Sequence, residues 1–83
     1  EIIRRDDGSL LVDGQCSFYE FLEYIDMECL YPEYDYNTIS GLILHLLEHI
    51  PHTGEKISWH ELEFEIVDMD GARIDKILVY SKQ

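Results

Sequence analysis

Two histidines and a glutamate near the middle of the chain have the spacing of a zinc-binding motif. His45, Glu48 and His49 match the pattern H-x-x-E-H, in which two helical histidines bind zinc and the glutamate acts as a base in one class of metallopeptidases. A catalytic zinc also needs a third protein ligand and a pocket that excludes water. A chain of 83 residues has little room for both, so we favour a polar surface, with adventitious metal binding and zinc catalysis as the alternatives.

Carboxylates are the other candidate cation ligands. Asp68, Asp70 and Gly71 match positions 3, 5 and 6 of an EF-hand loop, but Ile66 and Ile77 stand where two essential ligands belong, so a hairpin turn explains these residues better. Other carboxylates could form a weak site for a divalent cation, although simple solvation is the interpretation that we favour. They are Glu20, Glu23, Asp26, Glu28, Glu33 and Asp35.

The sequence contains no other pattern that predicts catalysis. No serine lies in a nucleophile-elbow motif, and no glycine-rich loop could hold a phosphate. Cys16 and Cys29 are too far apart for a C-x-x-C element, and we expect both to be free thiols. We therefore predict no enzyme activity, no catalytic residue and no metal ligand, and leave any cofactor-binding residues unassigned.

An apolar stripe at helical spacing predicts a core helix over residues 38–51, begun by Thr38 or Asn37 and ended by Pro51. At about 100° per residue, His45, Glu48, His49 and His52 would share the opposite, solvated face. Gly41 inside this helix suggests a close approach of another backbone. The stripe consists of Ile39, Leu42, Ile43, Leu46, Leu47 and Ile50.

The residues before this helix predict a hairpin and a shorter helix. Two apolar runs, residues 2–5 and 10–12, flank an Asp-Gly pair that favours a tight turn. Ser17 and Glu20 form a capping box at the start of a helix of about ten residues that ends near residues 26–28. Its buried face comprises Phe18, Phe21, Leu22 and Ile25. Residues 28–37 would form an ordered loop whose tyrosines cover the edge of the core.

Beyond residue 56 the apolar period changes to that of strands. Ile57 and Trp59 alternate with polar residues, as do Leu62, Phe64 and Ile66, and a turn at residues 70–71 leads to a last strand that reaches residue 82. We predict one α+β domain over residues 1–83, with element order β-β-α-α-β-β-β and two helices on one face of a mainly antiparallel sheet.

The composition narrows the range of partners. Eighteen acidic residues against six lysines and arginines give a net charge of −12, which disfavours binding to nucleic acid and to anionic membrane surfaces. No apolar run is long enough to span a bilayer, so we expect this piece to be soluble and not to insert into a membrane. The chain starts at Glu1 without an initiator methionine, and we expect it to be a fragment of a longer protein.

Several short motifs, in their order and spacing, resemble the CorC/HlyC transporter-associated domain over nearly the whole chain. They are Asp7-Gly8-Ser9, Val12-Asp13-Gly14, T-I-S-G-L-I-L at residues 38–44, Ile50-Pro51, Gly54-Glu55, Phe64-Glu65-Ile66-Val67, Asp70-Gly71 and Arg73-Ile74. The resemblance implies a C-terminal module of proteins similar to magnesium and cobalt efflux proteins and to hemolysins, where it follows nucleotide-sensing cystathionine-β-synthase-type domains and often a membrane region.

The resemblance also implies a function. We expect a non-catalytic accessory or regulatory domain, without a cofactor, on the cytoplasmic side of the membrane. Its partners would be neighbouring domains of the parent protein or a second copy of itself. The fold would be related to the flavin-binding domains of certain oxidoreductases, so the alternative is a small-ligand-binding module for a divalent cation or for FAD or an adenine nucleotide.

Overall fold

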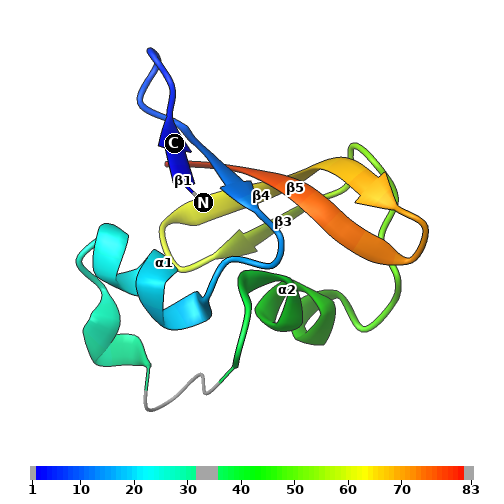
Figure 1. The fold of residues 1–83 in the computed structure, drawn as a ribbon, viewed down its shortest axis with the longest axis horizontal. Coiled ribbons are helices and arrows are strands. Elements are labelled where there is room, and N and C mark those ends of the chain that lie inside the picture. The colour runs from blue at the N-terminus through cyan, green and yellow to red at the C-terminus, as the bar shows by residue number, and fades with distance from the viewer. Residues whose placement is uncertain (1, 32–35, 82–83) are drawn as a thin grey trace.

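The computed structural model describes residues 2–31 and 36–81, which form a five-stranded sheet and the helices packed against it (Figure 1). The strands lie in the order β1-β2-β5-β4-β3, and all neighbours are antiparallel, which confirms the predicted α+β fold and element order. Within these residues, no helix combines the length and the apolar character needed to cross a membrane. The elements are β1 (Ile2–Arg4), β2 (Leu10–Asp13), α1 (Phe18–Tyr24), a 3-10 helix η1 (Glu28–Leu30), α2 (Ile39–Leu47), β3 (Lys56–Trp59), β4 (Leu62–Asp70) and β5 (Arg73–Ser81).

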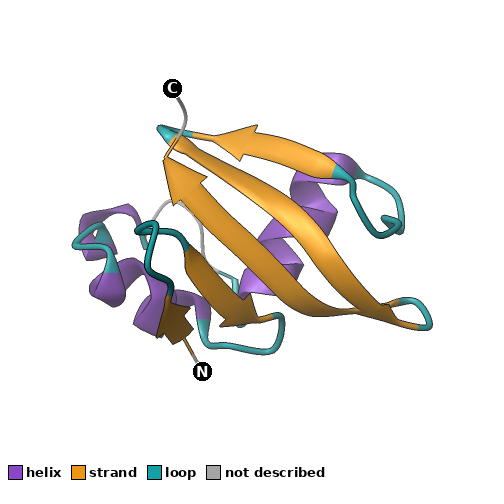
Figure 2. Ribbon diagram, turned by 90° about the horizontal axis from the view of Figure 1, so that it is seen from above, coloured by secondary structure: helices purple, strands orange, loops and turns teal. Residues whose placement is uncertain are grey.

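The core lies between the helices and one face of the sheet. Figure 2 shows both helices on the same side of the strands. Alternate strand residues point to this side, and burying their apolar surface stabilises the fold by about 25 cal/mol per Å². The largest fully buried side chains are Val12, Phe18, Phe21, Leu22, Ile39, Leu42, Ile43, Phe64, Ile66, Ile74, Ile77 and Val79.

Helix α1 begins as predicted but is shorter than expected. The Ser17 hydroxyl accepts a hydrogen bond from the Glu20 backbone N–H at 3.3 Å, which is one of the two bonds of the predicted capping box. The helix has seven residues rather than ten, because Asp26 adopts a left-handed conformation with φ of 61°. The Met27 N–H then donates to the Leu22 carbonyl at 2.8 Å, which turns the chain away from the helix axis.

Helix α2 also ends earlier than the apolar stripe predicts. Thr38 is the N-cap, and its hydroxyl accepts from the Gly41 N–H at 3.2 Å. Glu48, with φ of 62°, ends the helix in a left-handed turn after Leu47. Ile50 therefore leaves the stripe and is 62% exposed, so its predicted place in the core was wrong.

The described part of the segment between the helices covers the core edge as predicted. Residues 28–30 form η1, which the sequence did not predict, and the Tyr31 and Tyr36 rings lie 6.3 Å and 6.0 Å from the Phe18 ring. Residues 32–35 lie outside the described part of the chain, as does residue 82, where the last strand was expected to end.

The two helices start side by side and satisfy each other's first N–H groups. Phe18 donates to the Asn37 carbonyl at 3.0 Å, while Ile39 donates to the Cys16 carbonyl at 3.0 Å. Ser40 donates to the Gly14 carbonyl at 3.1 Å. These groups have no partner inside their own helices, so the contact between residues 14–18 and 37–40, which we call the helix-start pairing, supplies what the helices lack.

Gly14 is the glycine at which two backbones approach closely, rather than Gly41 as the sequence suggested. Its N–H donates to the Asp75 carbonyl at 2.9 Å, and a Cβ atom on Gly14 would lie 2.2 Å from the Ile74 carbonyl oxygen. At Gly41 the nearest atom to such a Cβ is the Thr38 hydroxyl oxygen, at 3.6 Å, which is ordinary contact.

A pair of bulges brings β5 to this position. The register of β4 against β5 shifts on both sides of the Asp68–Lys76 pair, which inserts Val67 into one strand and Asp75 into the other. The inserted Asp75 explains how Ile74 and Ile77, three residues apart, both face the core. The bulge thus places the Asp75 carbonyl where the Gly14 N–H can reach it.

The difference between the two glycines can be tested by substitution. Gly14→Ala should lower the free energy of unfolding by about 3 kcal/mol, because the new methyl group overlaps the β5 backbone. Gly41→Ala, in an open helical position, should raise it by about 0.5 to 1 kcal/mol through better helix propensity. Urea unfolding at equilibrium measures both, and equal effects of the two substitutions would contradict this description of the close approach.

Candidate functional site

The end of helix α2 separates the residues of the H-x-x-E-H pattern. His45 lies on the helix with its ring 5.5 Å from that of Tyr36, Glu48 is the C-cap, and His49 and His52 belong to the loop that follows. The prediction that these four residues share one helical face was therefore wrong. The early helix end gives them different directions, and the metallopeptidase geometry does not form.

His49 and His52 instead both contact the carboxylate of Glu55, a contact that the sequence analysis did not predict. His49 Nε2 lies 2.5 Å from Glu55 Oε2, and His52 Nδ1 lies 3.3 Å from Glu55 Oε1. The His52 backbone N–H donates to the same Glu55 Oε1 at 3.2 Å. A carboxylate that joins two residues of its own loop holds that loop in a fixed turn.

Both ring nitrogens of His49 have a hydrogen-bond partner. Its Nδ1 lies 2.9 Å from the Leu47 carbonyl oxygen, while its Nε2 faces Glu55. The His49 ring therefore joins the helix end to Glu55 and closes the turn after α2.

The environment of Glu55 lowers the pKa of its carboxyl group. Burial alone acts to raise this pKa, but the hydrogen bonds from the His52 backbone and the His49 ring, with the nearby histidine charges, outweigh it. The net direction is below the ordinary value of 4.5. The folded state therefore favours the ionised form of the Glu55 carboxyl group.

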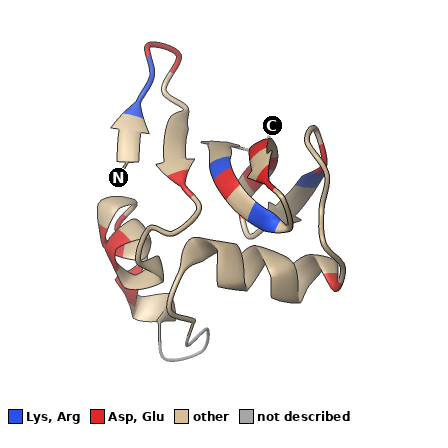
Figure 3. Ribbon diagram, turned by 45° about the vertical axis from the view of Figure 1, so that its right-hand side comes forward, with Lys and Arg blue, Asp and Glu red and all other residues tan. Residues whose placement is uncertain are grey.

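The other candidate ligands are the predicted acidic group and the carboxylates near the β4–β5 turn. The four described carboxylates of the predicted acidic group lie along α1 and η1, where Figure 3 shows acidic residues gathered, while Glu33 and Asp35 fall outside the described residues. Across residues 2–31 and 36–81, no three histidine, cysteine, aspartate or glutamate side chains are grouped to hold a metal ion. Gly71 and Ala72 form the turn between β4 and β5, and Asp70 pairs with Arg73 across it, which confirms the predicted hairpin.

Both cysteines are free thiols, as predicted. Cys16 is buried beside the start of α1, and burial raises the pKa of its thiol, so it stays protonated and unreactive. Cys29 is exposed on η1.

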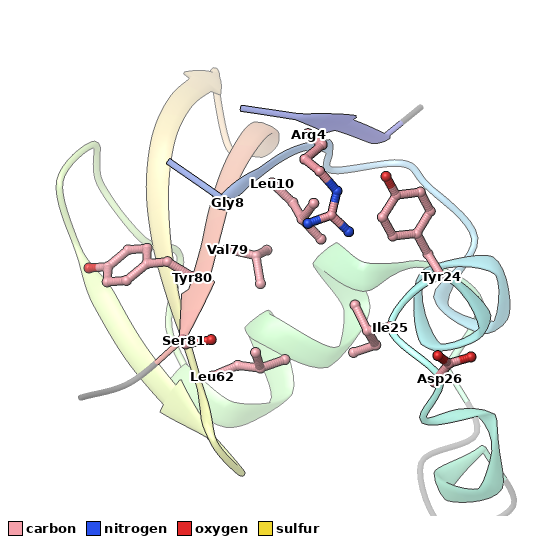
Figure 4. Close-up of a pocket in the computed structure, with 10 residues that line it drawn as sticks. All are labelled: Arg4, Gly8, Leu10, Tyr24, Ile25, Asp26, Leu62, Val79, Tyr80 and Ser81. Atoms are coloured by element: carbon pink, nitrogen blue, oxygen red, sulfur yellow. The ribbon is translucent and has the colours of Figure 1, made fainter. Parts of the chain in front are cut away.

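A pocket of about 330 Å³ lies between the β1–β2 hairpin, the end of α1 and the end of β5 (Figure 4). Leu10, Ile25, Leu62 and Val79 line it with apolar groups. The polar residues of its lining include Arg4, Tyr24, Asp26 and Ser81.

The side chain of Arg4 supplies the positive charge in the lining of this pocket. Figure 4 shows its side chain reaching into the space next to Tyr24, and its guanidinium carbon lies 5.7 Å from the centre of the Tyr24 ring. Such a contact holds the guanidinium in place while its N–H groups remain able to donate in the plane of the group. The sequence analysis missed this site because its residues come from distant segments and form no local motif.

The family model of the transporter associated domain, CorC_HlyC, matches residues 3–83. The chain belongs to the CorC_HlyC family. The resemblance found in the sequence is thus confirmed.

Similar proteins include both longer relatives and a solved domain. A UPF0053 protein of Synechocystis is 44% identical over 81 residues, and a polyamine export protein of Haemophilus influenzae is 33% identical over 78 residues. These matches cover 95% and 94% of this chain but only 18% of each relative, so the chain spans less than a fifth of their length.

The structure of a CorC_HlyC domain from a Xylella fastidiosa hemolysin, in complex with Mg²⁺ and Mn²⁺, is 38% identical to this chain. The two structures superpose with a TM-score of 0.85, and the match covers 99% of this chain and 98% of the Xylella chain. The shared fold therefore includes the sheet and both helices.

The lowered pKa of Glu55 predicts a pH dependence of stability. Because the folded-state pKa lies below 4.5, Glu55 contributes stability that is complete above that pH and is lost as the pH falls through the folded value. Glu55→Gln should therefore destabilise the domain at pH 6, and the difference from wild type should shrink toward pH 3. Urea unfolding at both pH values measures this.

Glu61→Gln, at an exposed glutamate in the β3–β4 turn, is the matched control and should leave the stability unchanged at both pH values. A Glu55→Gln variant as stable as this control at pH 6 would show that the carboxylate does not hold the loop.

Proposed function

We propose that residues 1–83 form a non-catalytic accessory domain, at the C-terminal end of a longer membrane-associated export protein. The domain regulates transport from the cytoplasmic side of the membrane, through contacts with neighbouring domains or with a second copy. The observation that carries this proposal is the family match over nearly the whole chain, to relatives of which it covers only 18%.

The contacts that the polar side chains make within the domain support a role without catalysis. The histidines that matched the zinc motif are engaged elsewhere, His49 and His52 with Glu55 and His45 with the Tyr36 ring. The buried cysteine is held in its protonated form. These side chains stabilise the domain itself, which fits a module that works by binding other protein surfaces.

The names of related proteins support a cationic cargo for the parent. One relative is a polyamine export protein, and the family resemblance implies magnesium and cobalt efflux proteins. Polyamines and divalent metal ions share a positive charge, so we propose that the parent exports a cation.

Removal of the domain tests this function. The parent protein lacking residues 1–83, reconstituted in vesicles, should export its cation at a rate changed by at least threefold, or should change its oligomeric state in light scattering. Restoring the domain with the Gly41→Ala substitution should restore the wild-type behaviour. If neither the rate nor the assembly changes on removal, the domain has no regulatory role.

Binding of a divalent cation is a second candidate function. The related Xylella domain was solved in complex with Mg²⁺ and Mn²⁺, and in this chain several acidic residues lie in α1 and η1 (Figure 3). Oxygen-rich surfaces suit such hard cations.

Calorimetry on the 1–83 chain distinguishes the two candidates. Saturable binding of Mg²⁺ or Mn²⁺ below about 100 µM, roughly −5.5 kcal/mol, would support a cation site. The double substitution Glu20→Gln and Glu23→Gln should then abolish it, with Glu61→Gln as the control. Titrations with Co²⁺, Zn²⁺ and FAD complete the series. If none of the five ligands binds, the accessory role remains as the proposed function.

A further inference from the structure

We propose that two copies of this domain pair through the face of the sheet opposite the helices, which we call the open face. The two sheets pack face to face about a two-fold axis that runs parallel to the strands, between β2 and β5. The inference rests on the proposed function, because it names the second copy as the partner and the surface that contacts it.

The open face is the uncovered side of the sheet. Both helices lie on the other side, and none of the described elements covers this one (Figure 2). Because side chains alternate along a strand, the residues next to the buried strand residues point to the open face. Figure 4 shows this alternation for Val79 and Tyr80, whose side chains leave β5 on opposite sides.

An apolar row crosses the open face. Ile3 pairs with Leu11 across β1 and β2, and Leu11 pairs with Leu78 across β2 and β5. Side chains that are directly opposite in an antiparallel pair lie about 5 Å apart, so these three form a continuous strip. Tyr80 extends the strip along β5. Ile3 is 51% exposed and the other three are half-buried, so a second sheet would remove more apolar surface from water.

A neighbouring row of the open face carries alternating charges. Asp13 pairs with Lys76, and Lys76 pairs on its other side with Asp68. The Lys76 Nζ atom lies 3.4 Å from Asp75 Oδ2, and the Lys76 side chain is 40% exposed. An ammonium group has three N–H donors, so Lys76 can also bind a carboxylate of another molecule.

A two-fold axis between β2 and β5 makes both rows complementary to themselves. Such an axis places each β2 residue against the β5 residue of the other copy that it pairs with in its own sheet. Leu11 therefore meets Leu78 of the second copy. Asp13 meets Lys76 of the second copy, and the symmetry makes each of these contacts twice.

Charge favours the open face over the rest of the surface for this contact. The chain has a net charge of −12, so two copies repel each other over most of their surfaces. On the open face, both lysines stand opposite acidic residues in the register, Lys56 opposite Glu65 and Lys76 opposite Asp13. Opposite charges can therefore meet across the axis, which lowers the repulsion between the copies.

The size of the open face suits a weak dimer. The domain measures 31 × 30 × 24 Å, and the sheet lies in the plane of its longest and shortest axes (Figure 2). A contact over this plane approaches the about 800 Å² per partner of a standard interface. Its apolar centre is small, so we expect a dissociation constant between about 1 µM and about 1 mM.

Analytical ultracentrifugation of the 1–83 chain at increasing concentration tests this inference. The Xylella structure, of which the domain makes up 98%, indicates that such a domain folds by itself. The wild type should change from monomer to dimer between about 1 µM and about 1 mM. Asp13→Lys or Lys76→Asp alone places like charges against each other across the axis, so each should weaken the dimer at least about tenfold.

A mixture of these two variants separates a contact between copies from an effect within one chain. In the mixed dimer, opposite charges meet again across the axis, although each chain keeps its own like-charged pair across β2 and β5. Mixing should therefore restore the affinity to within about threefold of wild type. Lys56→Asp is the matched control, since it makes the same charge change on the open face but on the edge strand β3, and it should leave the dimer unchanged.

A second measurement needs no variant and so does not depend on how the variants fold. When the wild type is diluted, the amide NMR signals of β2 and β5 should shift with the fraction of monomer. The signals of α1 and α2, on the other side of the sheet, should stay where they are.

The other outcomes overturn the inference. A wild-type chain that is still monomeric at about 1 mM would refute the second copy as the partner. The proposed function would then stand on contacts with neighbouring domains, which removal of the domain from the parent tests separately. A dimer whose formation shifts the signals of the helices instead of β2 and β5, or one that the mixture fails to restore, would refute the open face as the interface.

Discussion

The fold depends on how the two helices begin. The first N–H groups of an α-helix have no partners within it, and a buried helix start needs them from elsewhere. Here each helix receives them from the segment that precedes the other, through the bonds of Phe18 to Asn37 and of Ile39 to Cys16. The side chains of Ser17 and Thr38 complete both starts. This pairing holds the starts of the two helices side by side.

Gly14 connects this pairing to the sheet. Its carbonyl accepts from the start of α2, and its N–H donates to the bulge in β5, so one residue joins both layers. Only a residue without a Cβ fits so close to the Ile74 backbone. At the edge of the sheet formed by β3, His49 and Glu55 close the loop that leads from α2 to that strand. Within the described surface, the pocket beside Arg4 brings apolar side chains and a guanidinium together.

Sequence reasoning succeeded where structure is local and failed where it depends on distant contacts. The sequence predicted the alternation of the strands, the Asp-Gly turns and the caps at Ser17 and Thr38, because each involves neighbours in the chain. The helix ends were not, since Asp26 and Glu48 take left-handed conformations that usually favour glycine. The early end of α2 in turn separated the histidines and brought two of them to Glu55. Gly14 and the Arg4 pocket depend on strand register and on segments far apart, which no spacing reveals.

Amide hydrogen exchange at Ile39 and Ser40 tests the central claim most directly. If the helix-start pairing holds the two layers together, these N–H groups can exchange only when the whole domain unfolds. Their opening free energies should then equal the free energy of unfolding measured in urea. Exchange as fast as that of the exposed β4–β5 turn would show that the helices do not depend on each other at their starts.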